Sequence, residues 1–456
     1  MDYELSDAVN RGFRYFESFT NLERQAGTAR TPMRLDRMRA LLAAFGHPQR
    51  TFRSLHIAGS KGKGSTAAFL ESVLRTYGYR VGLYTSPHVR DYRERIWIDG
   101  RPAEDALLRD VFTLIRAHVE HRYPPDPPAD RTPESEQASV SKPDPGRPTT
   151  FELLTLLAFL VFREAGCDWA VVETGLGGRL DATNVLEPAA CLITRIEREH
   201  VEYLGDRLEQ IADEKAGIIK AGVPVFSAVQ RPEVAETIAR RAAERSAPLY
   251  TLESAASAVD TTLRRGGMRL RLTLAGFPEL TTTLRLIGSV QAQNAALAAY
   301  CVFRQFPEIA PAQIAAGLAG AWLPARGELL DTEPPVMIDG AHTADSVAAV
   351  CAEFCSLFPG PRTLVFGAVR GKDYRTMAAA LAPAFERIVV ARPGSFKPSD
   401  LRELAAAFGA LGAGVEVHPE AADAWRAASR YGYPVLVTGS FYLAAALHSV
   451  LDRIRR

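Results

Sequence analysis

The sequence lacks an excess of charge of either sign: 54 lysines and arginines stand against 53 aspartates and glutamates, which leaves a net charge of +1. A protein that binds nucleic acid through bulk charge needs a basic surplus, so we expect no nucleic-acid partner. Cysteine is scarce too, with five residues, mostly in apolar runs. We interpret them as reduced core residues of a cytoplasmic protein. Cys351 and Cys355 are four residues apart with no second ligand pair, so zinc is not expected.

Long apolar runs are also missing. No stretch approaches the roughly 20 apolar residues that a membrane-spanning helix needs. The longest run, residues 153–162, predicts a buried helix instead. The first 19 residues are polar and amphipathic without an apolar segment, so we expect no signal peptide and no membrane partner.

The composition that remains is that of a globular protein with large cores, because 47% of the 456 residues are hydrophobic and 23% are charged. This length suggests two or three domains. One window stands apart: residues 121–150 hold eight of the 29 prolines and few apolar side chains. Such a segment buries too little surface to order itself, so we predict a mobile insertion; a lid or partner-docking loop is the alternative interpretation.

Strand and helix patterns alternate along most of the chain. Residues 54–87 run strand, glycine-rich turn, helix and strand, which is a βαβ unit and predicts a parallel sheet. Residues 260–286 alternate with period two and predict a small antiparallel element. A boundary is expected near residues 323–328, because five further strands with helices between them follow it. That second part has an ordinary domain size.

The strongest local motif is Gly-Ser-Lys-Gly-Lys-Gly-Ser at residues 59–65, which follows a strand and opens a helix. Glycines let backbone N–H groups surround phosphate oxygens, and the helix N-terminus adds partial positive charge. Lys63 can then reach the terminal phosphates, and the Ser65 hydroxyl can face Mg²⁺. The alternative is a glycine-rich turn whose lysines have no role in binding, but the strand–loop–helix context favours phosphate binding. We therefore predict an α/β fold: a P-loop-type, mostly parallel sheet domain with the small antiparallel element (1–322), then a smaller Rossmann-like α/β domain (323–456).

The sequence of this loop resembles GTNGKGS, the corresponding loop of the Mur ligase superfamily and specifically of its folylpolyglutamate synthase and dihydrofolate synthase branch. Further segments resemble that family in the same order along nearly the whole chain. They are YTSPHVRDYRERI, ETGLGGRLDATN, LEQIADEKAGIIKAGVPV, QAQNAALA, IDGAH and VLVTGS. A single match could be chance, but a series in the family's order is strongly specific.

The resemblance implies a set of site residues, each assigned here by its position in the matching motif. ATP binding falls to Gly59, Ser60, Lys61, Gly62, Lys63, Gly64, Ser65, Asn294, Arg326, Asp339 and His342. Metal ligation, with two Mg²⁺ ions expected, falls to Ser65, Ser86, Glu173 and His200. Catalysis falls to Lys63, His200 and Lys215, and substrate binding to His88, Arg95, Gly177 and Asp181.

The residues themselves leave alternatives open at several of these positions. Glu173 ends a strand and could be a surface residue, and Asp339 precedes a glycine and could simply shape a turn. Lys215 matches a lysine that the family often carries as a carbamate, which requires a neutral amine and hence a lowered pKa. The alternative is an ordinary helix lysine paired with Glu214 or Asp213.

Some positions depart from the family pattern. Lys61 adds a cation beside the phosphates, Val290 replaces a histidine before Gln291, and Arg93 and Thr343 each replace an asparagine. Gly327 replaces an aromatic residue of the family's Pro-Gly-Arg-Phe-Glu segment. These positions border the nucleotide and substrate, so substrate identity is less constrained than reaction type.

The resulting prediction is a cytoplasmic, monomeric ATP-dependent amide ligase that joins L-glutamate to dihydropteroate, to a reduced folate, or to both, through an acyl phosphate. A Mur-type ligase for another acid is the near alternative, although only 58 residues precede Gly59, too few for the UDP-binding domain of such relatives. A P-loop kinase or ATPase and a non-catalytic ATP-binding regulator are the alternatives from other classes.

Overall fold

The computed structural model describes residues 6–21, 33–123, 146–394 and 398–455. Most of the proline-rich window predicted as a mobile insertion therefore lies outside the described residues. Its last two residues, Thr149 and Thr150, are buried and belong to the start of a helix. The chain forms two compact units: residues 1–63, 78–86 and 95–251 make unit 1, and residues 64–77, 87–94 and 252–456 make unit 2.

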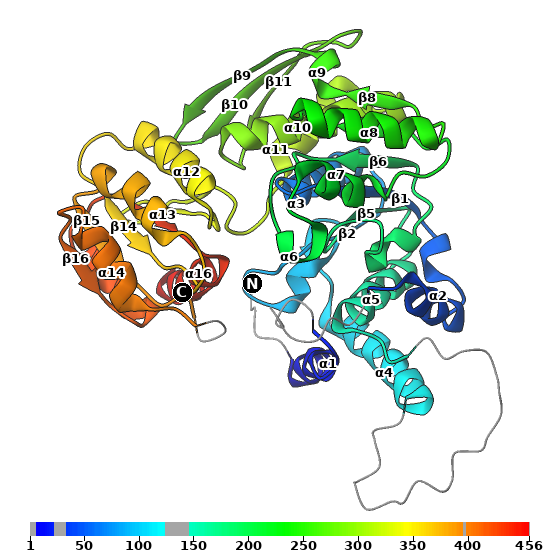
Figure 1. Ribbon diagram of the computed structural model, residues 1–456, viewed down its shortest axis with the longest axis horizontal. Helices are drawn as coiled ribbons and strands as arrows, with labels where there is room; N and C mark the ends of the chain where they lie inside the picture. The colour runs from blue at the N-terminus through cyan, green and yellow to red at the C-terminus, as the bar shows by residue number, and fades with distance from the viewer. Residues whose placement is uncertain (1–5, 22–32, 124–145, 395–397, 456) are drawn as a thin grey trace, which may run out of the picture. The chain divides into compact units, whose positions relative to one another are not determined.

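Unit 1 is built on an eight-stranded sheet with the order β4-β3-β2-β5-β1-β6-β7-β8 (Figure 1). Its strands are β1 (Arg53–Ala58), β2 (Val81–Tyr84), β3 (Ile96–Ile98), β4 (Arg101–Pro102), β5 (Trp169–Glu173), β6 (Ala190–Ile193), β7 (Val225–Ser227) and β8 (Leu249–Thr251). All neighbours from β2 to β8 run parallel, whereas β3 and β4 form an antiparallel edge. The predicted mostly parallel sheet is confirmed. Because β1 and β5 are parallel neighbours, their carboxyl ends meet at one edge, which is where ligands of such sheets bind.

The helices of unit 1 are α1 (Asp7–Glu17), α2 (Leu35–Ala44), α4 (Asp105–Arg122), α5 (Thr150–Glu164), α6 (Val201–Leu204), α7 (Leu208–Ala216) and α8 (Pro232–Glu244). Helix α5 is apolar on all sides, so it must be buried, and nearly every side chain in it is. Thr149 and Glu152 form a capping box at its start. Glu152 also forms a buried ion pair with Arg37 of α2 at 3.1 Å, which ties α2 to this central helix.

Unit 2 contains α3 (Lys63–Tyr77), whose first residue belongs to unit 1, and a three-stranded antiparallel sheet. The strands are β9 (Ala256–Arg264), β10 (Gly267–Leu274) and β11 (Leu280–Leu284), followed by α10 (Ser289–Gln305) and α11 (Pro311–Gly320), while α9 (Leu252–Ala255) precedes them. The predicted antiparallel element is thus confirmed. Thr282 of β11 donates to the Ala315 carbonyl of α11 at 2.7 Å, and a Cβ on Gly317 would lie 2.4 Å from Val73, so α11 packs closely on both β11 and α3.

The rest of unit 2 is a six-stranded sheet with the order β12-β13-β17-β14-β15-β16. Its strands are β12 (Glu328–Leu330), β13 (Val336–Ile338), β14 (Thr363–Phe366), β15 (Arg387–Val390), β16 (Val415–Val417) and β17 (Val435–Thr438), all parallel except β12. One core joins the sheet to α12 (Ala344–Leu357), α13 (Tyr374–Leu381) and α14 (Leu401–Gly409), and another joins it to α15 (Ala421–Ser429) and α16 (Phe441–Arg455). Helices therefore cover both faces, as the Rossmann-like prediction requires.

The described residues contain no helix that combines the length and apolarity needed to cross a bilayer. All five cysteines are free thiols, and four of them are buried. Short elements were the ones that the sequence patterns did not show, above all the β3–β4 edge and β12, which have two or three residues each.

Candidate active site

The loop after β1 is held in place by the segment after β6. Gly59 has φ of +150°, and a Cβ there would lie 1.8 Å from the Thr194 hydroxyl, so only glycine fits. The Ser60 N–H donates to the Arg195 carbonyl at 2.9 Å, and the Ser60 hydroxyl donates to the Glu197 carbonyl at 2.9 Å. The predicted phosphate loop is thus a fixed turn that leads from a buried strand into α3.

Two lysines converge on the carbonyl of Gly59. Lys63 Nζ donates to it at 3.0 Å and Lys215 Nζ at 2.7 Å. Each lysine also faces one carboxylate: Lys63 lies 3.9 Å from Glu173, and Lys215 lies 2.7 Å from Glu199. Two ammonium groups and two carboxylates therefore meet at the carboxyl end of β1 and β5, which concentrates charge where the loop turns.

Burial dominates the electrostatics of Lys215, whose side chain is 2% exposed. Burial and the nearby Lys63 lower its pKa from 10.5 to about 8, although Glu199 opposes this. Burial raises the pKa of Glu199, but Lys215 and Lys63 outweigh it and hold that pKa below its ordinary value. Lys215 is therefore close to the neutral state that carbamate formation needs.

The ordinary-lysine alternative for Lys215 is wrong in its choice of partners. Glu214 pairs with Arg179 at 2.6 Å. Asp213 instead pairs with Arg240 at 2.8 Å and with Arg241. The partner of Lys215 is Glu199, which the sequence analysis did not single out. The only feature of the sequence that pointed to Glu199 was its position directly before His200, a predicted metal ligand.

His200 begins α6 in the left-handed region, with φ of +48°. Burial lowers the pKa of its imidazole, and Lys215 and Lys63 lower it further, whereas Glu199 raises it. The imidazole is thus neutral near neutral pH, and a neutral imidazole can ligate a metal ion or accept a proton.

Glu173, at the end of β5, is 3% exposed and faces inward rather than lying on the surface. Its Oε2 accepts the Ser86 N–H at 3.0 Å while its Oε1 faces Lys63. Among the described residues, no three histidine, cysteine, aspartate or glutamate side chains are grouped so that they could hold a metal ion by themselves. A single buried carboxylate with serine hydroxyls suits Mg²⁺, which takes one or two carboxylates and completes its shell with phosphate and water. Ser65, the third residue of α3, is buried as well.

Asp181 organises the glycine-rich turn after Glu173. Its carboxylate accepts the N–H groups of Gly175 and Leu176, both at 2.9 Å, and the N–H of Thr183 at 3.0 Å. Burial raises its pKa, against these hydrogen bonds. Gly177 has φ of +68° within the same turn. Asp181 thus has a structural contribution in this turn, and the substrate-binding assignments of Asp181 and Gly177 stay predictions.

In unit 2, three predicted nucleotide residues lie together: Arg326 comes just before β12, and Asp339 and His342 follow β13. The Asp339 carboxylate accepts the Gly327 N–H and the Ala341 N–H, both at 2.7 Å. Asp339 therefore does shape a turn, which was the alternative interpretation of this residue. Burial raises the pKa of Asp339, and Arg326 opposes this. The His342 Nδ1 lies 2.9 Å from the Gly340 carbonyl. The structure brings Arg326, Asp339 and His342 together as one cluster.

The remaining predicted residues lie elsewhere. Asn294 is buried in α10 and donates to Gln291 one turn earlier at 3.1 Å, so its amide does not lie on the helix surface. The His88 ring lies 4.2 Å from that of Tyr92. Arg95 is 1% exposed. The roles of Asn294, His88 and Arg95 stay predictions.

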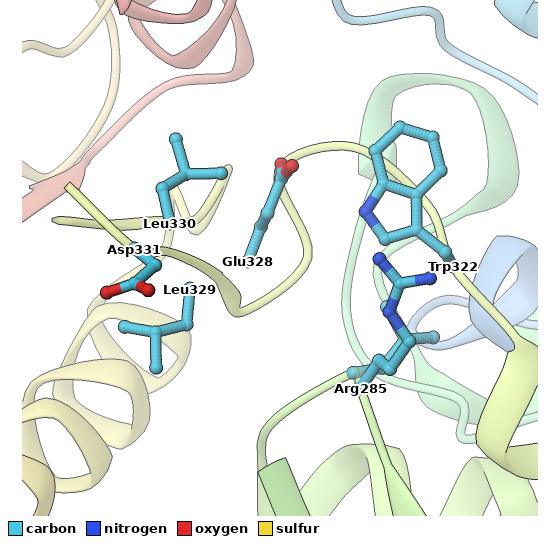
Figure 2. Close-up of a pocket in the computed structure, with 7 residues that line it drawn as sticks. Arg285, Trp322, Glu328, Leu329, Leu330 and Asp331 are labelled. Atoms are coloured by element: carbon cyan, nitrogen blue, oxygen red, sulfur yellow. The ribbon is translucent and has the colours of Figure 1, made fainter. Parts of the chain in front are cut away.

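A pocket of about 320 Å³ lies within unit 2, where β12 follows the loop from α11 (Figure 2). Its lining residues are Arg285, Leu286, Trp322, Glu328, Leu329, Leu330 and Asp331. In Figure 2 the Arg285 guanidinium points toward the Trp322 indole. The sequence analysis assigned none of these residues to a site.

The lowered pKa of Lys215 predicts a pH-dependent stability. Its folded-state pKa of about 8 lies below its ordinary value of 10.5, so the unfolded chain binds more protons between these pH values and stability rises with pH there. From pH 7 to 9.5 we expect a gain of about 2 kcal/mol relative to Lys215→Met. Urea unfolding of both proteins at both pH values measures this. A parallel pH dependence of the two proteins would contradict the assignment.

Models of two known domain families match this chain. The Mur ligase middle domain matches residues 134–302, and the Mur ligase glutamate ligase domain matches residues 325–441. The chain is 33% identical to folylpolyglutamate synthase of Lacticaseibacillus casei over 427 residues, which cover 91% of this chain and 94% of that protein. It is 36% identical to dihydrofolate synthase/folylpolyglutamate synthase of Bacillus subtilis over 355 residues, which cover 76% of this chain and 78% of that one.

Solved structures agree with these sequence relatives. Mycobacterium tuberculosis folylpolyglutamate synthase complexed with ADP matches with a TM-score of 0.84 and 28% identity, covering 99% of both chains. Thermotoga maritima folylpolyglutamate synthase matches with a TM-score of 0.82 and 27% identity, covering 98% of this chain and 97% of that one. The chain therefore belongs to the folylpolyglutamate synthase and dihydrofolate synthase family of the Mur ligases and is an ATP-dependent ligase.

Proposed function

We propose that this ligase joins L-glutamate to a pterin carboxylate, either dihydropteroate or a reduced folate, with release of ADP and phosphate. The observation that carries the proposal is that Lys63 and Lys215 both donate to the carbonyl of Gly59, with the Glu173 carboxylate facing Lys63. The names of the relatives, which are folylpolyglutamate and dihydrofolate synthases, support the substrate class.

The proposed chemistry has two steps. A carboxylate oxygen of the pterin acid attacks the γ-phosphorus of ATP, the bond from that phosphorus to the bridging oxygen breaks, and an acyl phosphate and ADP form. The amine nitrogen of glutamate then attacks the acyl carbon, phosphate leaves, and the nitrogen loses a proton to form the amide. The first step needs positioning and charge neutralisation rather than covalent help. Lys63 and the loop amides of residues 59–65 are suited to both.

The chain's own residues divide this work by their chemistry. Lys63 exchanges its contact with the Gly59 carbonyl for a phosphate oxygen, and Arg326, Asp339 and His342 are assigned to the nucleotide. Glu173, Ser65 and Ser86 would hold Mg²⁺, and His200 would be the nitrogen donor to a second ion. When bound, Mg²⁺ neutralises phosphate charge. Lys215, whose lowered pKa makes the neutral amine more accessible than in an ordinary lysine, would carry the carbamate beside them.

The alternatives make different demands on the substrates. A P-loop kinase or ATPase would release ADP without any amine, and a non-catalytic regulator would bind ATP and release none. A Mur-type ligase for another acid would need glutamate or another amine together with a non-pterin acid. The match over both Mur ligase domains favours an amide ligase over the first two.

The test is ADP release by the purified protein with ATP and Mg²⁺, with dihydropteroate, tetrahydrofolate and L-glutamate added singly and in pairs. We expect release only when an acid and glutamate are both present. Release with dihydropteroate would establish the dihydrofolate synthase reaction, and release with tetrahydrofolate would establish chain extension. No release with either pair would overturn the folate assignment, and release without glutamate would point to a kinase or ATPase.

A further inference from the structure

The backbone around Arg326 is held in an unusual conformation. Both neighbours of Arg326 have positive φ, with Ala325 at +54° and Gly327 at +59°. A left-handed residue with a Cβ is strained and persists only where its surroundings enforce it. At Gly327 a Cβ would lie 2.4 Å from the Ile287 carbonyl oxygen, so glycine is required there.

Two carboxylates and one carbonyl fix this turn. The Ala325 N–H donates to Glu328 Oε2 at 3.0 Å, and the Gly327 N–H donates to Asp339. The Ala325 carbonyl accepts the Gly340 N–H at 3.0 Å. Arg326 is therefore presented from a backbone held on both sides, and the direction of its side chain depends on what holds Glu328 and what the guanidinium rests on.

The guanidinium rests on an aromatic ring from another element. Phe441, the first residue of α16, has its ring centroid 4.3 Å from the central carbon of the Arg326 guanidinium, a cation–π arrangement. The same ring meets His342 edge to face at 5.8 Å. A Cβ on Gly340 would lie 2.0 Å from this ring, so Phe441 fills the space beside that glycine completely. One phenyl ring thus touches two of the three predicted nucleotide residues of the cluster.

Seven residues later, α16 contacts the same turn again. His448 Nε2 lies 2.6 Å from Glu328 Oε2, the oxygen that also accepts the Ala325 N–H. Both side chains are buried. Positions i and i+7 share one face of a helix, so Phe441 and His448 both belong to the face of α16 that meets the turn. Arg90 faces Glu328 from another segment, and Arg90 in turn pairs with Glu94 and Asp452.

The charge state of Glu328 agrees with this arrangement. Burial raises the pKa of Glu328, but the hydrogen bond and the charge of His448, with the Ala325 N–H and Arg90, bring it below its ordinary value. The carboxylate is thus ionised near neutral pH and can accept both hydrogen bonds at once.

We propose that α16 is the positioning element of the nucleotide cluster: Phe441 holds the Arg326 guanidinium and the His342 ring, and His448 locks, through Glu328, the strained turn that presents Arg326. The inference rests on the proposed role of Arg326 in nucleotide binding. It adds Phe441 and His448 as positioning residues, which do not touch ATP: His448 acts through Arg326, and Phe441 acts through Arg326 and His342.

A double-mutant cycle on nucleotide affinity tests this directly. Calorimetry would measure binding of ADP and of a non-hydrolysable ATP analogue, each with Mg²⁺, to the wild type, R326A, F441L, H448Q, F441L/R326A and H448Q/R326A. A lost cation–π contact predicts roughly 3- to 30-fold weaker binding for F441L, and we expect a loss in the same range for H448Q. In the R326A background H448Q should not weaken binding further, because its effect passes through Arg326, and F441L should weaken binding less than it does in the wild type, because only its contact with His342 remains.

Three further variants separate positioning from stability. F441Y keeps the ring and should restore binding. F408L makes the same change in the other core of unit 2, where Phe408 packs on Phe366 at 5.3 Å, and should destabilise the protein without weakening binding. If H448Q does not fold, E328Q tests the same link, because it removes the charge that His448 meets.

The outcomes are distinguishable. Equal losses in the wild-type and R326A backgrounds, or F441L and H448Q affinities equal to that of the wild type, would overturn the positioning inference and leave the proposed function standing. Unchanged binding in R326A itself would reject the nucleotide assignment of Arg326, and the inference with it.

Discussion

Replacing Lys63 with methionine is expected to lower the rate of ADP release by about 10³-fold or more, because a fixed cation that offsets the charge of a transferring phosphoryl group contributes on that scale. Lys63 is poised for this role: its ammonium group is 3.0 Å from the Gly59 carbonyl and 3.9 Å from Glu173, at the start of α3. Methionine keeps most of the length of the side chain and removes the ammonium group, with its charge and its hydrogen-bond donors. Steady-state ADP release with both substrates present measures the effect.

The matched control is Lys61→Met, two residues earlier in the same loop. The family's pattern has a neutral residue at that position, so we expect a change of less than about tenfold. Comparing the two variants separates loss of one positioned cation from a general loss of positive charge. Turnover by Lys63→Met within tenfold of the wild type would remove Lys63 from the catalytic set, and equal losses in both variants would mean that the loop acts through net charge alone.

The parts of the fold that the sequence predicted share a physical origin. Strands buried on both faces must be continuously apolar, and their ends need glycine or polar turns, so β1, β5, β6, β13, β14, β15 and β17 all stood out. The β3–β4 edge did not, because strands of two or three residues show no period. Helix α7 ends at Ala216, where Gly217 follows. The side-chain amide of Asn184, 33 residues earlier in the chain, donates to the Gly217 carbonyl at 3.1 Å. This carbonyl is therefore satisfied without a further turn of the helix.

The site residues likewise fall into those that the sequence indicates and those that it does not. Lys63, Glu173 and Asp339 sit at strand ends or a loop, positions that a sequence marks directly. Glu199 could not be paired with Lys215 in advance, because 16 residues and a change of helix separate them. The contacts of α16 are more remote still: His448 meets Glu328 across 120 residues. Composition and spacing indicate which residue types can do chemistry, but tertiary packing decides what holds them.

The second large effect concerns the charge state of Lys215, for which Lys215→Arg is the most informative substitution. Arginine keeps the positive charge and can still pair with Glu199, but its guanidinium does not lose a proton in a protein and so cannot capture CO₂. If catalysis needs a carbamate, Lys215→Arg should lose activity by about 10²-fold or more, as much as Lys215→Gln does, since removal of one group that stabilises charge in a reaction centre has effects of this order. If an ammonium group suffices, Lys215→Arg should stay far more active than Lys215→Gln.

Two measurements make this comparison decisive. Wild-type activity should fall when CO₂ and bicarbonate are removed and return when bicarbonate is added, whereas the two variants should not respond. A carbamate carbon signal in the NMR spectrum of protein incubated with ¹³C-bicarbonate should be present in the wild type and absent from Lys215→Arg. Because the pKa of Lys215 is lowered to about 8, the neutral amine is far more abundant at pH 7.5 than for an ordinary lysine, and carbamate formation should be favoured as pH rises toward 8. Full activity of Lys215→Arg without bicarbonate would instead make the Lys215–Glu199 pair a structural support for the Gly59 turn.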